Sequence, residues 1–353
     1  MKFCTMQENR FRARLVYAGR DSPWLTWKEL INSTMTENYL VYSNSRILIL
    51  LIPSLVIISF VTFALIRFIP GDTAVAMTEE LGYAANLEEL RSLLGIDRPI
   101  HVQYFDWVGG FFRGDFGHSL WDGSDAASEL LHRLPITLEI ALLSLFISVA
   151  IAIPIGVYSA VRQDTWGDYT ARSAVVLFDS VPHFWIATLI LILPAYYVGW
   201  VPAVGWVPFS EDPVKHLMLV GLPASILGVG STASLIRLTR AMMLETLRQD
   251  YVRTAWSKGL SERSVLYRHA LKNALIPVVT FFGLRIPNAV SGSVIMEAVF
   301  GIPGVGRWII DAINFRDYPQ LQVALLFIAI MVMVSNLLVD LFYGWLDPRV
   351  HYD

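Results

Sequence analysis

Six long apolar stretches, separated by shorter polar segments, dominate the pattern of hydrophobic and polar positions along the chain. A helix needs roughly 20 residues to cross about 30 Å of hydrocarbon, and each stretch is long enough. The pattern therefore predicts an all-α integral membrane protein with six transmembrane helices. The predicted spans cover residues 47–69, 134–160, 172–198, 217–240, 274–299 and 321–346.

Composition supports this class, because 55% of the 353 residues are hydrophobic and only 16% are charged. Soluble domains carry more charge than this. The formal net charge is −3, and Lys and Arg are spread over several loops. We therefore expect no nucleic-acid partner. Cys4 is the single cysteine, which excludes an intramolecular disulfide and a metal site built on several thiolates.

The distribution of Lys and Arg orients the chain in the membrane. Counted from Arg237, the fourth–fifth loop, together with residues 1–46, the second–third loop and the tail, carries 18 of the 27, against 7 in the segments on the other side. By the positive-inside rule, both termini are cytoplasmic. Residues 1–46 then form a cytoplasmic extension, residues 47–346 the transmembrane domain and residues 347–353 a cytoplasmic tail. Residues 70–133 form an extracytoplasmic segment, and residues 241–273 form a cytoplasmic loop.

The cytoplasmic loop has the pattern of two short helices joined at a glycine. The first helix is amphipathic, with four apolar residues at helical spacing: Tyr251, Val252, Ala255 and Trp256. Gly259 suits the end of this helix, and Ser261 suits the N-cap of the next, which runs to Lys272. An elbow of this kind, outside the membrane, is suited to docking a partner.

The loop is similar to a known family pattern. Arg253, Thr254, Ala255 and, four residues on, Gly259 resemble the EAA loop of ATP-binding-cassette importer permeases. Arg253 stands where the general pattern has Glu, and the longer run DYVRTAWSKGLSERSVLYRHALKNALIP resembles the peptide and nickel permease subfamily. Further blocks resemble the first of the two membrane subunits of dipeptide and oligopeptide permeases: RFIPGD at 67–72, LGIDRPIHVQY at 94–104, GDFGHSL at 114–120, RLPITLEIALLS at 133–144, SVPHFW at 180–185, EAVFGIPGVGRWIIDAI at 297–313, RDYPQLQ at 316–322 and NLLVDLFYGWLDPRV at 336–350.

The resemblance covers residues 35–353 and implies half of a type I importer permease, with both termini in the cytoplasm. Met35 is where a typical member begins, so residues 1–34 are either an extension or the result of an upstream start. The implied partners are a sister permease subunit, two ATP-binding cassette subunits, an extracytoplasmic substrate-binding protein and the lipid of a prokaryotic cytoplasmic membrane.

The chain has no Gly-x-x-x-x-Gly-Lys-Ser/Thr loop, the motif that cradles nucleotide phosphates. We therefore expect that it is not an enzyme and holds no cofactor. ATP and Mg would be bound by the partner ATPase subunits.

By the same resemblance, the first helix of the loop fits a cleft on the ATPase, and movement of the ATPase turns the attached spans. Arg253 is the candidate for a charged contact, while Ala255 and Gly259 allow close approach because they are small. The alternative is an amphipathic helix that lies on the membrane without a partner. The candidate coupling residues are Asp250, Tyr251, Arg253, Thr254, Ala255, Lys258 and Gly259.

Asp179 and Arg285 are the candidate residues of the translocation path, because charges inside spans are costly and often functional. Arg285 lies near the midplane, and Asp179 lies roughly 10 Å in from the cytoplasmic face. There they would meet the opposite charges of a zwitterionic peptide. The alternative is that each pairs with polar groups on neighbouring helices and holds the bundle together. We predict no metal site, because the lone His183 has no second ligand at helical spacing.

Small residues in the fourth span, among them Ala224, Gly228 and Thr232, predict close helix packing.

The cargo stays open at this stage. Similar proteins most often carry peptides, but chains of the same pattern carry nickel chelates, glutathione or other small solutes. A self-contained secondary transporter is a more distant alternative, and it would need no docking loop. The sequence has no HExxH or GxSxG motif, so it gives no support to an intramembrane enzyme.

Overall fold

The computed structural model describes residues 53–68, 71–81 and 87–346. Within these residues every regular element is a helix, and one isolated antiparallel bridge joins His118 and Asp125. The predicted N-terminal extension and C-terminal tail lie outside the described residues.

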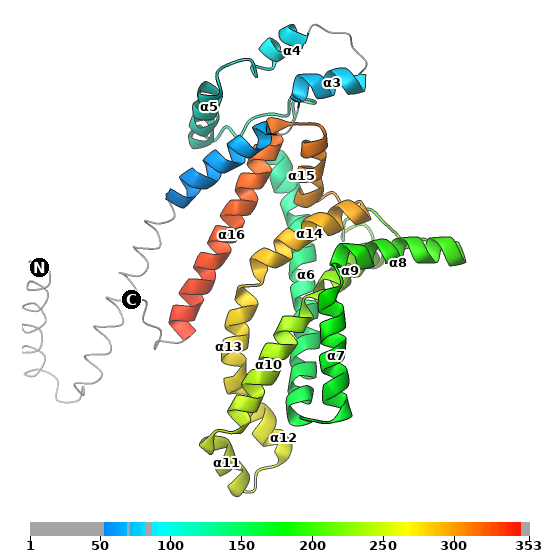
Figure 1. Ribbon diagram of the computed structural model, residues 1–353, viewed down its shortest axis with the longest axis vertical. Helices are drawn as coiled ribbons and strands as arrows, with labels where there is room; N and C mark the ends of the chain where they lie inside the picture. The colour runs from blue at the N-terminus through cyan, green and yellow to red at the C-terminus, as the bar shows by residue number, and fades with distance from the viewer. Residues whose placement is uncertain (1–52, 69–70, 82–86, 347–353) are drawn as a thin grey trace, which may run out of the picture. The chain divides into compact units, whose positions relative to one another are not determined.

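Figure 1 shows the helices, coloured from blue to red along the chain. An unlabelled helix, Pro53–Arg67, precedes the labelled ones. These are α3 (Thr73–Leu81), α4 (Leu87–Leu93), α5 (Ile100–Arg113), α6 (Ala126–Val161), α7 (Trp166–Ser180), α8 (His183–Val198), α9 (Pro213–Gly230), α10 (Thr232–Leu247), α11 (Asp250–Ser257), α12 (Glu262–Ser264), the π-helix η1 (Val265–Leu271), α13 (Lys272–Gly283), α14 (Ile286–Phe300), α15 (Val305–Asn314) and α16 (Tyr318–Leu346).

The apolar stretches of the sequence are helical, but several are broken. By length and composition, α6, α9 and α16 can each cross a membrane. Two bent pairs pass the same test, α7 with α8 at an angle of 88° and the helical stretch ending in α13 with α14 at 49°. The described residues are therefore all-α, and by length and composition several of their helices can cross a membrane.

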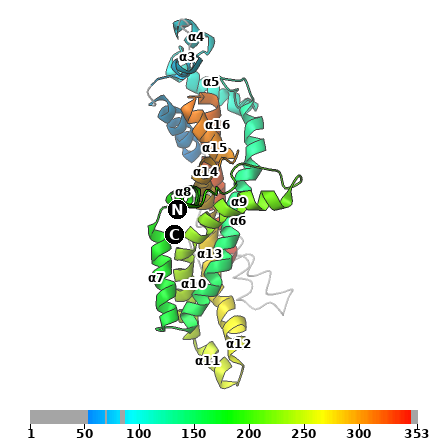
Figure 2. The same ribbon diagram turned by 90° about the vertical axis from the view of Figure 1, so that its right-hand side faces the viewer.

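The predicted span 172–198 is not one straight helix, because α7 and α8 meet at a sharp corner (Figures 1 and 2). Pro182 disfavours helical geometry in the residue before it, and Val181 accordingly has extended backbone angles. The helix α6 also differs from its prediction. It begins at Ala126 rather than at residue 134, and the Asp125 side chain caps it by accepting a hydrogen bond from Ser128 N at 2.9 Å.

Close packing on α6 organises the transmembrane core. This helix contacts α9, α10 and α14. A Cβ atom on Gly228 of α9 would lie 2.7 Å from the Ser144 carbonyl oxygen, and one on Gly156 would lie 2.6 Å from Thr239 Cβ of α10. The small residue at Gly228 therefore permits the close approach of helices that the sequence predicted.

A buried carboxylate fixes the turn from α14 to α15. Glu297 is fully buried, and its Oε2 accepts hydrogen bonds from Gly306 N at 2.7 Å and Arg307 N at 3.3 Å. Thr137 Oγ1 of α6 accepts a third from Val305 N at 2.8 Å. The first backbone N–H groups of a helix have no partner within it. Side chains from α14 and α6 thus provide the cap of α15.

Two of the sequence blocks meet at the connection between α15 and α16. Ser119 Oγ donates to Asp317 Oδ2 at 2.5 Å, and Trp121 Nε1 donates to the Phe315 carbonyl at 2.7 Å. Burial raises the pKa of the Asp317 carboxyl, and this effect outweighs the hydrogen bonds that lower it. The end of the segment predicted to be extracytoplasmic is thereby fastened to the connection between α15 and α16.

A histidine on α9 is held between two acceptors. His216, with an exposed fraction of 1%, places Nδ1 2.7 Å from the Val207 carbonyl and Nε2 2.5 Å from Glu139 Oε1 of α6. A carbonyl can only accept, so Nδ1 carries the hydrogen. One further proton must then lie between Nε2 and the carboxylate. This contact ties α9 and the loop before it to α6.

Replacing Glu139 with Gln is expected to preserve this contact, because the amide N–H can donate to a neutral His216 Nε2. Replacement with Leu removes the partner of a buried nitrogen, which costs about 1–3 kcal/mol. Thermal unfolding of the purified chain in detergent measures the difference. Equal melting temperatures for Glu139→Leu and Glu139→Gln would show that the contact contributes nothing to stability.

Candidate functional site

The elbow, which the sequence predicts to be cytoplasmic, begins where α10 ends and comprises α11, α12 and η1 (Figures 1 and 2). Val252 and Ala255 of α11 are buried against Val265 of η1, with Leu247 packed beside them. Their spacing of three residues puts both side chains on one helix face. The predicted amphipathic helix is present, and it packs on its own chain through this narrow apolar stripe.

Two of the four apolar residues predicted for that stripe lie outside it. Tyr251 and Trp256 are 42% and 46% exposed. Tyr251 Oη accepts a hydrogen bond from Asn273 Nδ2 of α13 at 2.8 Å, so its ring borders the elbow rather than entering its core. The outer surface of α11 therefore presents two aromatic rings together with its polar residues.

Ala255, which the resemblance implies allows close approach to the ATPase because it is small, faces the inside of the elbow. It is only 5% exposed and packs within the elbow, so a partner protein would not touch its side chain. Its small size instead lets α11 lie close against η1. Thr254 is exposed, and its hydroxyl donates to the Asp250 carbonyl at 2.9 Å within the helix.

Gly259 has the position predicted for it at the end of α11. Its φ is +73°, and a Cβ atom there would have no neighbour within 4 Å. Its N–H donates to the Trp256 carbonyl at 3.0 Å. Residues other than glycine rarely adopt this backbone conformation. Ser261 follows as the N-cap of α12, although its side chain forms no capping hydrogen bond.

Charges on the elbow are held loosely. Arg253 Nη1 lies 3.5 Å from Asp250 Oδ1, with side-chain exposures of 72% and 96%. Exposed pairs of this kind contribute little to stability, so both groups are free to exchange partners. Lys258 is also exposed. The surface of the elbow can therefore form charged and aromatic contacts with a protein. Among the described residues, no group of three metal-ligating side chains occurs.

Arg285 lies at the break between α13 and α14, where it precedes the first residue of α14. Its guanidinium lies 4.9 Å from the centroid of the Phe281 ring. It also lines a small cavity of ≈ 20 Å³ with Ser148 of α6, Ser231 and Asn288. The side chain thus faces the interior of the bundle, beside the break between α9 and α10.

Asp179, the other candidate for the path, is paired. Its Oδ2 lies 3.0 Å from Arg237 Nη2 of α10. This geometry supports the alternative in which the charge joins neighbouring helices. A second pair on the same helices was not anticipated, because Asp168 and Arg240 lie 72 residues apart. The spacing of Thr165 and Asp168 at the start of α7 is the capping signature that could have indicated a structural role.

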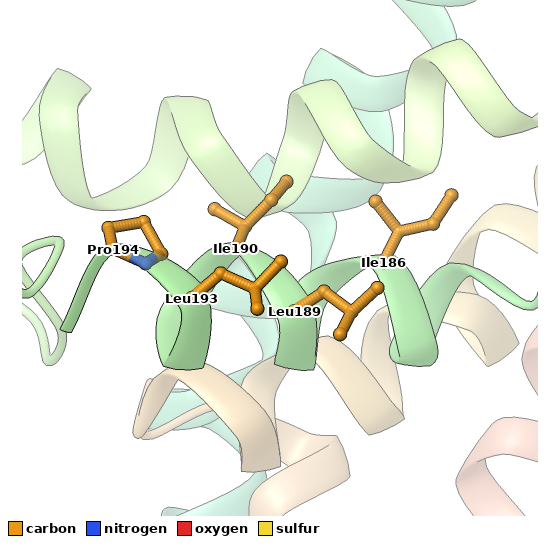
Figure 3. A pocket seen from close by; sticks show the side chains of 5 residues that line it. All are labelled: Ile186, Leu189, Ile190, Leu193 and Pro194. Atoms are coloured by element: carbon orange, nitrogen blue, oxygen red, sulfur yellow. The ribbon is translucent and has the colours of Figure 1, made fainter. Parts of the chain in front are cut away.

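A recess on α8 is apolar. Figure 3 shows its lining side chains, Ile186, Leu189, Ile190, Leu193 and Pro194 of α8. Its volume is ≈ 360 Å³. None of these side chains carries a polar group that could orient a charged solute. The recess therefore suits packing against lipid or another apolar surface, and it is separate from Arg285.

The chain is similar to known transport proteins. The profile described as "Binding-protein-dependent transport system inner membrane component" matches residues 152–352, and a profile of the corresponding N-terminal part matches residues 40–141. The di/tripeptide transport system permease protein of Pseudomonas aeruginosa is 37% identical, over 87% of this chain and 98% of that one. The oligopeptide transport system permease protein of Bacillus subtilis is 37% identical, over 85% and 96%, and the dipeptide transport system permease protein of Escherichia coli is 36% identical, over 86% and 96%.

Proposed function

Because this chain belongs to the family of binding-protein-dependent transport system inner membrane components, we propose that it is the permease subunit of an ATP-driven importer of peptides. The named cargoes of its relatives support peptides as the substrate class. The chain crosses the membrane six times with both termini in the cytoplasm. The broken helices then provide the corners of its transmembrane part.

The chain works with a sister permease, two ATP-binding cassette subunits and an extracytoplasmic substrate-binding protein. ATP and Mg bind to the cassette subunits, and this chain supplies no catalytic group to their hydrolysis. Its own contribution is half of the path through the membrane. The description of the family, which names a dependence on a binding protein, supports this assembly.

The observation that carries the proposal is the outer surface of α11. Tyr251 and Trp256 are large, half-exposed rings, and Arg253 beside them is largely exposed. Aromatic residues and Arg are enriched among the residues that contribute most to protein interfaces. We assign this surface, with Asp250, Thr254, Lys258 and Gly259, to contact with the ATPase.

Arg285 lines the translocation path in this proposal. Its place at a helix break inside the bundle, with Ser231 and Asn288 on the same cavity, supports the assignment. Unwound breaks near the membrane midplane are where other transporters place polar contacts to their cargo. Peptide uptake whose concentration dependence is unchanged in Arg285→Ala would contradict this assignment.

Reversing the charge of Arg253 is expected to release the ATPase. Copurification of the cassette subunits with tagged Arg253→Glu in mild detergent should fall by about tenfold or more, the size of effect that a central charged contact produces. Arg113→Glu, at an exposed residue of the extracytoplasmic helix α5, is the matched control. Undiminished copurification with Arg253→Glu and Tyr251→Ala together would refute the docking surface.

A further inference from the structure

The helix α7 is fastened to α10 at its first turn by a buried carboxylate. The Asp168 side chain is 0% exposed and faces the guanidinium of Arg240, whose Nε and Nη2 donate to Oδ1 at 3.0 Å and Oδ2 at 2.8 Å. Ser159 Oγ at the end of α6 and Asp164 N donate to the same carboxylate. Two parallel hydrogen bonds from one guanidinium fix orientation as well as distance.

A second ion pair joins the same two helices at the other end of α7. Asp179, in the last turn, accepts a hydrogen bond from Arg237 Nη2 at 3.0 Å, and the two side chains are 44% and 51% exposed. Arg237 and Arg240 lie three residues apart on α10, hence on the same face. One turn of α10 therefore holds both ends of α7.

This pair of contacts lies between two moving parts of the proposed mechanism. Downstream, α10 leads into α11, the helix assigned to the ATPase, through Arg248 and Gln249. At its other end, α7 stops at the 88° corner before α8. The ring of His183, the first residue of α8, packs on Gly230 at the end of α9, where a Cβ atom would collide with the ring nitrogen Nε2.

We propose that Arg237 and Arg240 are positioning residues for energy coupling, which hold α7 to α10 so that a displacement received at α11 also moves the corner between α7 and α8. The inference rests on the proposed docking of α11 on the ATPase. Val175, in the middle of α7, is buried in a cluster with Ala233 and Ile236 of α10, and the ion pairs at the two ends fix the tilt of the helix. The Asp179–Arg237 pair therefore sets the angle of the corner.

The exposed pair offers the cleaner test, because removing either partner of the buried pair would leave an unpaired charge and endanger folding. The complete complex is reconstituted in liposomes with Asp179→Asn, Arg237→Gln or the exchanged pair Asp179→Arg/Arg237→Asp. ATP hydrolysis and uptake of trialanine are measured together. We expect each single variant to keep its ATPase rate and to lose about fivefold in uptake per ATP, the scale of one ion pair of moderate strength.

The exchanged pair is expected to restore uptake per ATP. A difference in the abundance or assembly of the complex would not produce this rescue. A proportional loss of hydrolysis and uptake in the single variants, or no rescue by the exchange, would overturn the proposal. If the wild-type complex hydrolyses ATP without taking up trialanine, that result counts against the proposed cargo. The positioning role is then tested by a second measurement, which uses no cargo.

The second measurement needs no cargo. Spin labels are attached at Val176→Cys on α7 and Ala241→Cys on α10, both exposed residues, in a Cys4→Ser background. In the otherwise wild-type complex, we expect a narrow distribution of distances between the labels, and ATP with vanadate should leave it unchanged. In Arg237→Gln, we expect ATP with vanadate to broaden the distribution. An equally narrow distribution in Arg237→Gln would show that α7 follows α10 without this contact and would overturn the proposal.

Discussion

Replacing Gly306 with Leu is expected to abolish stable folding of the transmembrane domain. A Cβ atom at this position would collide with the Val294 Cα and would lie 2.9 Å from Glu297 Oε2. The first neighbour is backbone and cannot rotate away, and the second is the carboxylate that caps α15. Overpacking of a core alone costs about 1–3 kcal/mol, and loss of the cap adds to it.

The effect is measured as the abundance of the protein in membranes and its unfolding temperature in detergent. Gly221→Ala is the matched control, because a Cβ atom added to this glycine of α9 would have no neighbour within 4 Å. Alanine at such a site is expected to be neutral or to stabilise the helix by up to about 1 kcal/mol. If Gly306→Leu unfolded at the same temperature as the wild type, the close packing described for the turn from α14 to α15 would be refuted.

The elbow formed by α11, α12 and η1 shows what the sequence could predict. Helical spacing and the glycine at position 259 are local signals, so the amphipathic α11 and its end could be inferred from residues a few positions apart. The sequence could not show which apolar residues of α11 are buried within the chain and which are exposed and available to a partner. Tyr251, Val252, Ala255 and Trp256 look equivalent in the pattern, yet only the middle two are buried. That division depends on η1, which packs against one side.

The sequence did not indicate where the helices break, and the reason is different. Pro154 lies within the unbroken α6 and Pro223 within α9, whereas Pro182 stands at a corner of 88°. A proline removes one backbone donor in every case, so its presence does not decide between continuation and a corner. Packing around the site decides it, and here the ring of His183 lies directly against Gly230. Contacts between distant residues of this kind have no local signal.

The charged residues within the helices show the same limit. The cost of intramembrane charge marked Asp179 and Arg285 as candidates and assigned them the same role. In the structure Asp179 has Arg237 as its partner, while Arg285 stacks on Phe281 and lines a cavity. A rule based on the cost of burying one charge contains no information about which partner the fold supplies.

Gly259 provides the second prediction with a large effect. Gly259→Trp is expected to insert into the membrane at the wild-type level and to lose at least about tenfold in ATP-driven uptake and in ATPase stimulation by the binding protein, because a bulky side chain would fill the space where the ATPase docks. The position is open in this chain, so the clash arises only with a partner.

Backbone strain must be separated from this clash, since a non-glycine residue at a φ of +73° is strained by about 1–2 kcal/mol. Gly114 is the control, because it ends α5 at a φ of +83° and is equally open. Gly114→Trp carries the same strain in a segment that the proposed topology places on the opposite side of the membrane. We expect it to keep uptake and stimulated hydrolysis. Equal losses in the two variants would attribute the effect to strain, and full activity of Gly259→Trp would remove α11 from the ATPase interface.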